Sequence, residues 1–458
     1  MEFLSSLFYF IIVIGILVFI HELGHFLAAR LSGMRTDTFA FGMGPRLFGY
    51  NRIDGFSFGK LPEDWNGNGH CDYRVSAFPI GGYVKIAGMV DESMDTDWVE
   101  TEPQEWEFRS KNVWQKLFVL SAGVIMNILL AFAIYSGISL IEGKTILQTT
   151  TVGFVQDSSL AQMIGIQAGD KIIEINNSSV KSWDQVLEKI ALEDLGDTRS
   201  IVINRNNERI KLNADGKQLL KAMTGSMTLG LVPENTLIVI GNVLPNSNAE
   251  KAGLLNKDTI ISVNDEEINA FTELTGILKQ HKNDEVKLSW KRNGQLFTKN
   301  VKVDETGKIG FAPIIANKSK IINESYGLFG SLAEGAKRTV NFGTMFINSI
   351  KQIFKGNISA KESLGGPIMI AKGARDYAQL GAEAFLNFIA MLSITLAIIN
   401  ILPLPALDGG HIVFIIIEAI IGKELPLKFK IAVQNIGIFL LLALMAYVFY
   451  NDIMRLFN

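Results

Sequence analysis

The most regular feature of this sequence is a set of four long apolar runs separated by polar segments. A helix needs about 20 mostly apolar residues to cross a bilayer, and each run reaches that length. A shorter apolar stretch at 412–421 contains Glu418 and is too brief to cross, so we expect it to be interfacial or packed against the other helices. The sequence therefore predicts a polytopic α-helical membrane protein with four transmembrane helices. The runs are Leu7–Ala29, Leu117–Ile141, Ala384–Leu407 and Ile431–Tyr450.

The region between the second and third runs has a different, strand-like pattern. Over 142–320 apolar residues alternate with polar ones, and Asn-Asn and Asn-Asp pairs give turn signals. The segment Ala161–Asn176 also returns, in unbroken register, as Ala249–Asn264. This spacing exceeds the roughly 20–50 residues of solenoid repeats and indicates a duplicated domain. We expect two β-rich domains, at 142–232 and 233–320.

Each repeat contains a short helix, a glycine and then the pattern Asp-x-Ile-Ile-x-(Ile/Val)-Asn. This pattern resembles the PDZ domains of bacterial proteases. PDZ domains can bind an extended peptide as an added strand, so the two domains either bind peptides in this way or serve as spacers.

The remaining segments complete the predicted organisation. Apolar residues within 324–355 recur at near-helical spacing, which favours an amphipathic helix that lies on the membrane or packs between domains. The predicted parts besides the two β-rich domains are a first transmembrane helix (1–30), a loop (31–116), a second transmembrane helix (117–141), an amphipathic linker (321–383), a third transmembrane helix (384–410), an interfacial segment (411–430) and a fourth transmembrane helix with a tail (431–458).

Composition and charge agree with a membrane protein and exclude other classes. Of the 458 residues, 19% are charged, whereas a soluble domain has about 25%. The net charge of −3 gives no basic field for nucleic acid, and a single Cys cannot form an internal disulfide. Lys and Arg gather in 31–116 and 411–430, so the positive-inside rule predicts that these segments are cytoplasmic. Both termini and 142–383 are then expected on the outer side.

The sharpest chemical signal is His21-Glu22-Leu23-Gly24-His25, inside the first apolar run. Two His at i and i+4 project from one helix face, where both imidazoles can bind one metal ion. Zinc accepts neutral imidazole, and a glutamate beside the ligands can take a proton from a water molecule that the ion activates. Ionisable groups in an apolar span are costly and mark a function. We therefore expect His21 and His25 as zinc ligands and Glu22 as the general base.

Catalytic zinc usually takes three protein ligands, so a third is needed. Asp408 ends the third apolar run on the same side of the membrane as the His pair, and it is the candidate. The alternative is that Asp408 caps a turn before a glycine. We interpret His281 as a surface residue and His411 as an interfacial packing residue, and the His70-Cys71 pair gives only a weak metal signal.

Two motifs together resemble the site-2 protease family of intramembrane zinc metalloproteases. They are His-Glu-x-x-His in the first run and Asn400-x-x-Pro403-x-Pro405-x-Leu407-Asp408-Gly409 at the end of the third. The resemblance extends over essentially the whole chain, including the two PDZ-like repeats and Gly365-Gly366-Pro367. It implies one zinc ion held by the two His and Asp408, water activation by Glu22, and a place in the bacterial inner membrane.

The resemblance also implies residues that position the substrate. Asn400 would hold the substrate near the ion, although a polar side chain in an apolar helix also commonly bonds a neighbouring helix. Residues 73–88 are implied to form a β-hairpin that dips back toward the site, with Gly81, Gly82 and Tyr83 near its middle. A helical substrate hides its peptide groups in its own hydrogen bonds, and an exposed strand edge offers replacement bonds to an unwound segment. The alternative is a hairpin that only folds the loop.

These features favour a zinc endopeptidase over two other classes of protein. The enzyme would cleave a single-span membrane protein within or near its transmembrane segment, in regulated intramembrane proteolysis. The resemblance implies a substrate already shortened on its outer side, such as an anti-sigma factor of an envelope stress response, or a remnant signal peptide. The alternatives are a metal or proton transporter and an inactive PDZ scaffold. Glu22 argues against both, because neither needs a base between two metal ligands.

Overall fold

The four apolar runs fold as helices, as the hydropathy pattern predicts. The structure is a computed structural model, which describes residues 2–62, 65, 67–89, 102–192, 196–223, 227–359, 361 and 365–457. Within these residues, the helices that are long and apolar enough to cross a membrane are Glu2–Leu31, Val113–Glu142, Ala382–Ile401 and Leu427–Arg455.

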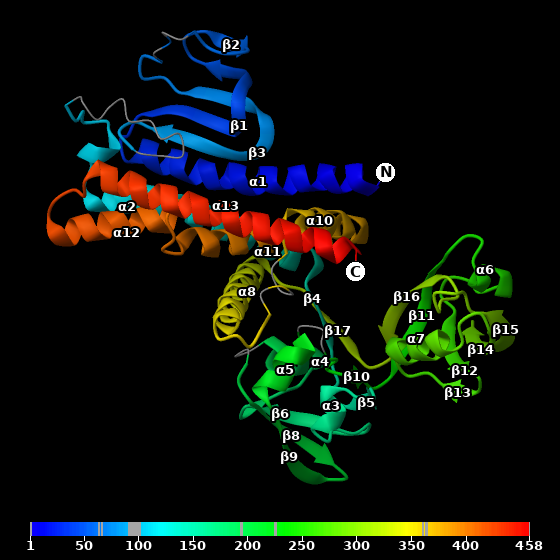
Figure 1. Cartoon of the computed structure of the whole chain (residues 1–458). Coiled ribbons are helices and arrows are strands. Elements are labelled where there is room, and N and C mark those ends of the chain that lie inside the picture. Colours follow the sequence, from blue (N-terminus) through cyan, green and yellow to red (C-terminus); the bar gives the residue numbers. More distant parts are fainter. Residues whose placement is uncertain are drawn as a thin grey trace. The chain divides into compact units, whose positions relative to one another are not determined.

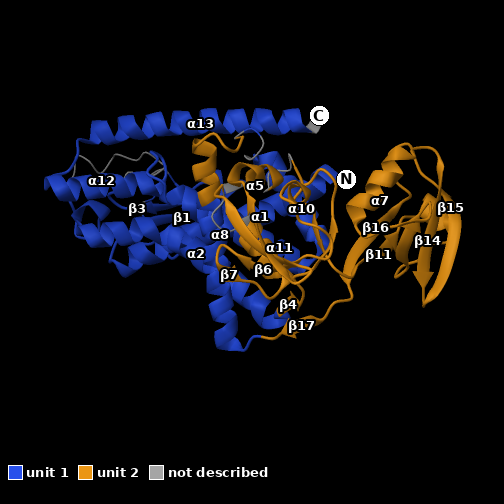
Figure 2. Ribbon diagram, turned by 90° about the horizontal axis from the view of Figure 1, so that it is seen from below, with its two compact units in different colours: residues 1–143, 326–347, 360–458 blue, residues 144–325, 348–359 orange. Residues whose placement is uncertain are grey.

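The chain folds into two units, which Figure 2 shows in different colours. The first unit comprises residues 1–143, 326–347 and 360–458, and the second comprises residues 144–325 and 348–359. The first unit is mainly helical (Figure 1), with α1 (Glu2–Leu31), η1 (Phe108–Ser110), α2 (Val113–Glu142), α10 (Pro367–Leu380), α11 (Ala382–Ile401), α12 (Asp408–Ile421) and α13 (Leu427–Phe457). The helix α8 (Leu328–Phe354) lies within the predicted 324–355 and begins in the first unit and ends in the second.

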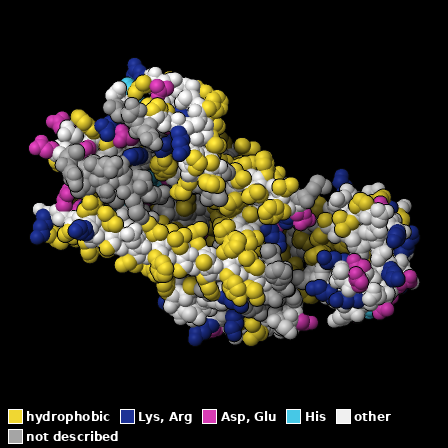
Figure 3. All heavy atoms as spheres, turned by 45° about the horizontal axis from the view of Figure 1, so that its top comes forward, with side chains coloured by type: hydrophobic (Ala, Val, Ile, Leu, Met, Phe, Trp, Pro, Cys, Tyr) yellow, Lys and Arg dark blue, Asp and Glu magenta, His cyan; other side chains and the backbone are white. Residues whose placement is uncertain are grey.

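Hydrophobic side chains cover much of the molecular face drawn in Figure 3. Along α13 the side chains of Phe439, Leu440 and Leu442 are all more than half exposed. Large contiguous apolar surfaces are rare on soluble monomers and mark contact with a partner or a membrane. The exposed apolar side chains of α13 therefore suit a helix surrounded by lipid.

The third apolar helix ends earlier than the sequence analysis predicts. The predicted transmembrane helix runs to residue 410, but α11 ends at Ile401 and a new helix, α12, begins at Asp408. Pro403 and Pro405 lack an amide hydrogen and clash with the preceding turn, so the helix cannot continue through them. Asp408 therefore lies in the first turn of a separate helix and does not lie at the end of the third span.

A three-stranded sheet follows α1 and lies beside it in the first unit (Figure 1). Its strands are β1 (Thr36–Asn51), β2 (Gly55–Phe58) and β3 (Asp72–Ile86), in the order β2-β1-β3. A buried ion pair, in which the Arg46 guanidinium donates to the Asp72 carboxylate at 3.0 and 3.1 Å, ties β1 to β3.

The predicted hairpin within 73–88 is wrong in its pairing. These residues belong to one bent strand, β3, and both of its halves pair with β1. Phe41 lies opposite Gly82 in one half, and Tyr50 lies opposite Tyr73 in the other. The positive φ of Gly81 (82°) lies at the bend, where a glycine adopts this conformation at little cost.

The second unit contains two small β-rich cores, one for each predicted repeat. The first repeat and its neighbours contain β4 (Lys144–Leu147), β5 (Val152–Val155), α3 (Leu160–Met163), β6 (Lys171–Ile175), β7 (Ser178–Ser179), α4 (Trp183–Leu187), η2 (Glu188–Leu192), β8 (Arg199–Arg205), β9 (Glu208–Ala214), α5 (Gly216–Met223) and β10 (Leu231–Pro233). The second contains β11 (Thr236–Val243), α6 (Asn248–Ala252), β12 (Thr259–Val263), β13 (Glu266–Glu267), α7 (Phe271–Gln280), β14 (Glu285–Arg292), β15 (Gln295–Lys302), β16 (Phe311–Asn317) and β17 (Ile321–Glu324).

The same ion pair recurs in both repeats and supports the predicted duplication. In the first repeat the buried Asp170 accepts hydrogen bonds from Arg205, which also donates to the Gly165 carbonyl. In the second repeat Arg292 donates to the buried carboxylate of Asp258 and to the carbonyl of Gly253. The strands β6-β7-β8-β9 and β12-β13-β14-β15 follow in the same order with the same pairing. The repeated sequence thus gives a repeated fold.

Candidate metal centre

The His pair lies on the face of α1 that packs against α2. His21 and His25 are one helical turn apart and are 7% and 9% exposed. Two glycines permit the close approach of the two helices. A side chain at Gly24 would lie 2.4 Å from the Ala122 carbonyl oxygen, and one at Gly123 would lie 2.5 Å from His25 Nε2. The imidazoles thus fill space that a larger residue at position 123 would occupy, and Gly24 lets the backbone of α2 approach α1.

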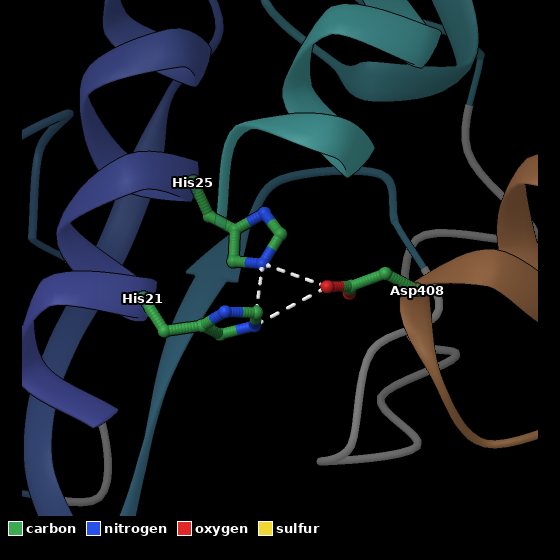
Figure 4. Close-up of side chains that lie close together, drawn as sticks. All are labelled: His21, His25 and Asp408. Atoms are coloured by element: carbon green, nitrogen blue, oxygen red, sulfur yellow. Dashed lines mark hydrogen bonds and ion pairs between the residues drawn. The ribbon is translucent and has the colours of Figure 1, made fainter. Parts of the chain in front are cut away.

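The Asp408 carboxylate reaches the same point from the start of α12 (Figure 4). Between α11 and α12 the chain folds back on itself, and a side chain at Gly409 or Gly410 would lie 2.2 or 2.4 Å from a backbone carbonyl oxygen of this turn. The two glycines after Asp408 therefore have a packing reason. They allow the tight turn that carries the carboxylate to the His pair.

Three candidate ligand atoms form a nearly equilateral triangle. His21 Nε2 lies 3.2 Å from His25 Nε2 and 3.2 Å from Asp408 Oδ2, and His25 Nε2 lies 3.4 Å from Asp408 Oδ2. A tetrahedral zinc ion with bonds of about 2.1 Å holds its ligand atoms about 3.4 Å apart. Asp408 Oδ2 is buried and has no hydrogen-bond partner among the described residues. A divalent cation would satisfy this oxygen and both imidazole nitrogens, so the donor set fits zinc.

Hydrogen bonds on the far side of each imidazole orient its Nε2 toward the triangle. His25 Nδ1 lies 2.8 Å from the Val119 carbonyl oxygen, an acceptor only, so the hydrogen is on Nδ1 and Nε2 carries a lone pair. His21 Nδ1 lies 3.2 Å from Asn127 Nδ2, while Asn127 Oδ1 has no partner among the described residues. Turning the Asn127 amide over would let Oδ1 accept from His21 Nδ1–H and would satisfy both groups. Such outer partners orient metal-binding His residues in general.

Two further side chains lie beside the triangle. Asn400 Nδ2, on α11, is 3.2 Å from His21 Nε2. Glu22 is half-buried between the two His on α1, and a side chain at Gly82 would lie 3.3 Å from its Cγ. The structure therefore brings together His21, His25, Asp408, Asn400 and the segment of β3 next to Glu22.

Comparison with known proteins decides the family. The chain matches the family described as Peptidase family M50 over residues 9–444. It belongs to this family.

The relatives of this M50 peptidase are similar over their full lengths. The regulator of sigma-E protease RseP of Escherichia coli is 29% identical over 473 residues, and the regulator of sigma E protease of Haemophilus influenzae is 30% identical over 481 residues. A protein of Pasteurella multocida that carries the name of a zinc metalloprotease is 32% identical over 470 residues. Each comparison covers 100% of both chains. The predicted site-2 protease resemblance is confirmed, and the chain is an intramembrane zinc metalloprotease of the inner membrane.

The remaining predicted substrate-positioning residues of the M50 peptidase lie at different distances from Glu22. Gly82 is next to Glu22, and the neighbouring Gly81 faces the Met43 side chain. The Tyr83 hydroxyl accepts a hydrogen bond from Arg74, whose guanidinium also stacks on the ring at 5.4 Å. Tyr83 is thus engaged within the sheet, and Gly82 is the member of this group that lies next to Glu22.

His411 and His281 lie outside the triangle. His411 bonds Gln434 at 3.0 Å between its Nε2 and the amide nitrogen. His281 is half-buried in the second unit and donates from Nδ1 to the Ile277 carbonyl oxygen at 2.9 Å. Among the described residues, the group able to hold a metal contains only His21, His25 and Asp408.

The buried Cys71 lies outside the triangle, and its thiol is protonated at neutral pH. Burial raises the pKa of Cys71 from 9.0 to about 11, and a metal ligand must be a thiolate. Because the unfolded chain releases this proton at lower pH than the folded chain, the free energy of unfolding should fall as pH rises from about 9 to about 11. We expect alkylation of Cys71 to reach half its maximal rate near pH 11 in the folded protein and about two pH units lower in denaturant. A single midpoint in both states, measured by mass spectrometry, would contradict this.

Sequence reasoning missed the residues that support the ligands. Asn127, Val119 and Gly123 all come from α2, and Ser393 on α11 donates to the Asn127 carbonyl oxygen at 2.7 Å. One signal was available, because Asn127 is a polar residue inside an uncharged apolar run. The role of the Val119 carbonyl cannot be predicted from the sequence, because every residue has a backbone carbonyl.

Proposed function

We propose that this M50 peptidase hydrolyses a peptide bond in a single-span membrane protein, near the membrane face at the Leu31 end of α1. The observation that carries the proposal is the buried His-His-Asp triangle with Glu22 beside it. His21 and His25 lie six to ten residues before the end of α1 at Leu31, which places them about 9–15 Å from that end. A bond cut at this depth lies inside the membrane but close to one surface.

In this proposal the residues have separate roles. His21, His25 and Asp408 hold one zinc ion, which when bound lowers the pKa of a water molecule and polarises a peptide carbonyl. Glu22 accepts the proton from the attacking water and delivers it to the leaving amine. Asn400, 3.2 Å from His21 Nε2, donates a hydrogen bond to the substrate backbone.

The edge of β3 next to Glu22 is proposed to bind the unwound substrate. Residues 82–86 pair with β1 along one edge, and β3 is an outer strand of its sheet. The free edge offers backbone donors and acceptors to an extended peptide. Gly82, next to Glu22, allows the peptide backbone to approach the base closely.

The wider arrangement also belongs to the proposal. The four apolar helices cross the inner membrane, residues 31–116 and 411–430 are cytoplasmic, and the termini and the PDZ-like repeats are on the outer side. The substrate is a membrane protein already shortened on its outer side, such as an anti-sigma factor or a remnant signal peptide. Two relatives carry the name regulator of sigma E protease, and this name supports the first choice. The repeats then exclude intact substrates by size or dock shortened ones.

The test is cleavage of a single-span reporter by the purified chain in detergent or liposomes. We expect one product cut within or near the span, loss of cleavage when a chelator removes the metal, and recovery with added zinc. Cleavage that persists in a metal-free sample, or zinc flux into liposomes without any cleavage, would overturn the proposal.

A further inference from the structure

An aromatic cavity of about 450 Å³ lies in the first unit, between α1 and its neighbouring sheet. For scale, an engineered cavity of about 150 Å³ stays dry and takes up benzene. Arg74 is the charged residue among its described lining. The lining is otherwise apolar or aromatic and consists of Phe19, Leu23, Phe26, Phe39, Phe41, Phe48, Gly49, Tyr50, Phe56, Tyr73 and Val75. Phe56, at the rim, is 60% exposed, so the cavity continues into an apolar surface.

The cavity lies on the side of α1 away from the metal ligands. Leu23 is two residues from both His21 and His25, and two residues on an α-helix turn the side chain by roughly 160°. A polypeptide in this cavity would therefore face away from the His-His-Asp triangle and could not be cut there. The cavity is not a subsite for the scissile bond.

A second, polar cavity meets the aromatic one at Arg74. Its described lining includes the basic residues Arg35, Arg46, Lys60, Arg74 and Lys85 and the acidic residues Asp37 and Asp72. Basic residues outnumber acidic residues five to two in this described lining, in which Arg35 pairs with Asp37 and Arg46 pairs with Asp72. Arg74 lines both cavities, and its Nε is buried with no hydrogen-bond partner among the described residues. An excess of basic groups thus adjoins an apolar cavity.

We propose that the two cavities bind one anionic phospholipid, with an acyl chain in the aromatic cavity and the phosphate against Arg74. The apolar wall of the cavity belongs to α1, a helix apolar enough to span the membrane, and Phe19 at that wall is 41% exposed. Phe19, Leu23 and Phe26 lie in the half of α1 that ends at Leu31. This half lies at the depth of the leaflet next to the sheet, where acyl chains are the surrounding solvent. Basic pockets beside membrane helices recognise anionic headgroups in the same way.

The proposed lipid site does not depend on the proposed protease function, so the labelling experiment can contradict the first without affecting the second. The probe is a phosphatidylglycerol with a diazirine in one acyl chain, in nanodiscs of phosphatidylcholine containing the full-length protein. After irradiation we expect adducts on residues 19–26 and 48–56, in excess over adducts on the exposed residues of α13. A phosphatidylcholine probe should label these segments about fivefold less, because a basic residue near the surface favours anionic lipid by about that factor.

Val75→Trp tests the cavity, and Arg74→Gln tests the headgroup contact. The larger side chain of Val75→Trp should exclude about two methylene groups of the acyl chain from the cavity. The loss of their burial weakens binding, so we expect labelling to fall about tenfold. Leu440→Trp, at an exposed position of α13, is the matched control and should leave labelling unchanged. Arg74→Gln should remove the preference for phosphatidylglycerol, and Arg74→Lys should restore it.

Zinc content serves as the folding check, since the metal ligands lie on the opposite side of α1. If Val75→Trp loses zinc, the experiment uses Val75→Leu instead, which fills less of the aromatic cavity. This variant should reduce labelling by a smaller factor. The proposal is overturned if adducts are spread equally over α1 and α13, or if folded filling variants label as the unchanged protein does.

Discussion

Glu22→Gln is expected to abolish peptide-bond cleavage while zinc stays bound. The amide keeps the size of the side chain and its place between His21 and His25, but it cannot accept the proton of the attacking water. General-base catalysis contributes about a thousandfold, so cleavage of a single-span reporter should fall by at least that order. Zinc content, measured by atomic emission on the purified variant, should match that of the unchanged protein, because the three candidate ligand atoms are untouched.

Two comparisons separate the role of a base from that of a ligand. Glu22→Asp keeps a carboxylate but withdraws it by one methylene, and a misplacement of about 1 Å can cost about a hundredfold in rate. His21→Ala should lose both zinc and cleavage. If Glu22→Gln still cleaves at the original rate, or if it loses zinc as His21→Ala does, Glu22 is not the base.

The chemistry of the site was predictable because it is local in the sequence. His21, Glu22 and His25 share one helical segment, and the 3.6-residue period alone places the two His on one face. Asp408 required an argument about membrane depth, since it lies far away in the chain. The structure places the Asp408 carboxylate beside the two imidazoles, although the helix that carries Asp408 is α12 and not the predicted third span.

The predictions failed where distant segments decide the structure. Residues 73–88 have the glycines and the apolar alternation of a hairpin, but β1 supplies the pairing partner for both halves of the strand. The partner of an edge depends on which long-range pairing satisfies more backbone groups, and alternation within one segment cannot reveal it. The helix break after Ile401 differs from the strand pairing because nearby residues cause it. Pro403 and Pro405 end the helix, and both can be read from the sequence.

The hydrogen-bond partners of the two imidazoles could not be predicted from the sequence either, because they depend on how α1 packs against α2. The contact places the Val119 carbonyl and the Asn127 amide behind the two imidazoles. Small residues commonly mark close helix contacts in membranes, but a glycine in an apolar run does not say which helix it meets. Of the α2 glycines, Gly123 meets both His side chains, whereas a side chain at Gly137 would meet nothing within 4 Å.

This difference between two glycines of one helix gives the second strong prediction. In Gly123→Ala the new methyl group would lie 2.5 Å from His25 Nε2 and 2.6 Å from His21 Cε1, so both rings must move. Loss of orientation around metal ligands costs about 10–100-fold in metal affinity. We expect zinc affinity to fall by that factor, measured by dialysis against buffers of fixed free zinc, and reporter cleavage at low zinc to fall in parallel.

Gly137→Ala is the matched control, because it makes the same change on the same helix in open space. Alanine favours a helix over glycine, so this variant should keep its zinc and its thermal stability. Excess zinc should restore cleavage to Gly123→Ala if the methyl group only displaces the ligands, because the base and the Asp408 carboxylate remain in place. Equal zinc affinity in the two variants would show that the imidazoles can accommodate the added methyl group. The close approach of α1 and α2 would then not determine the geometry of the metal site.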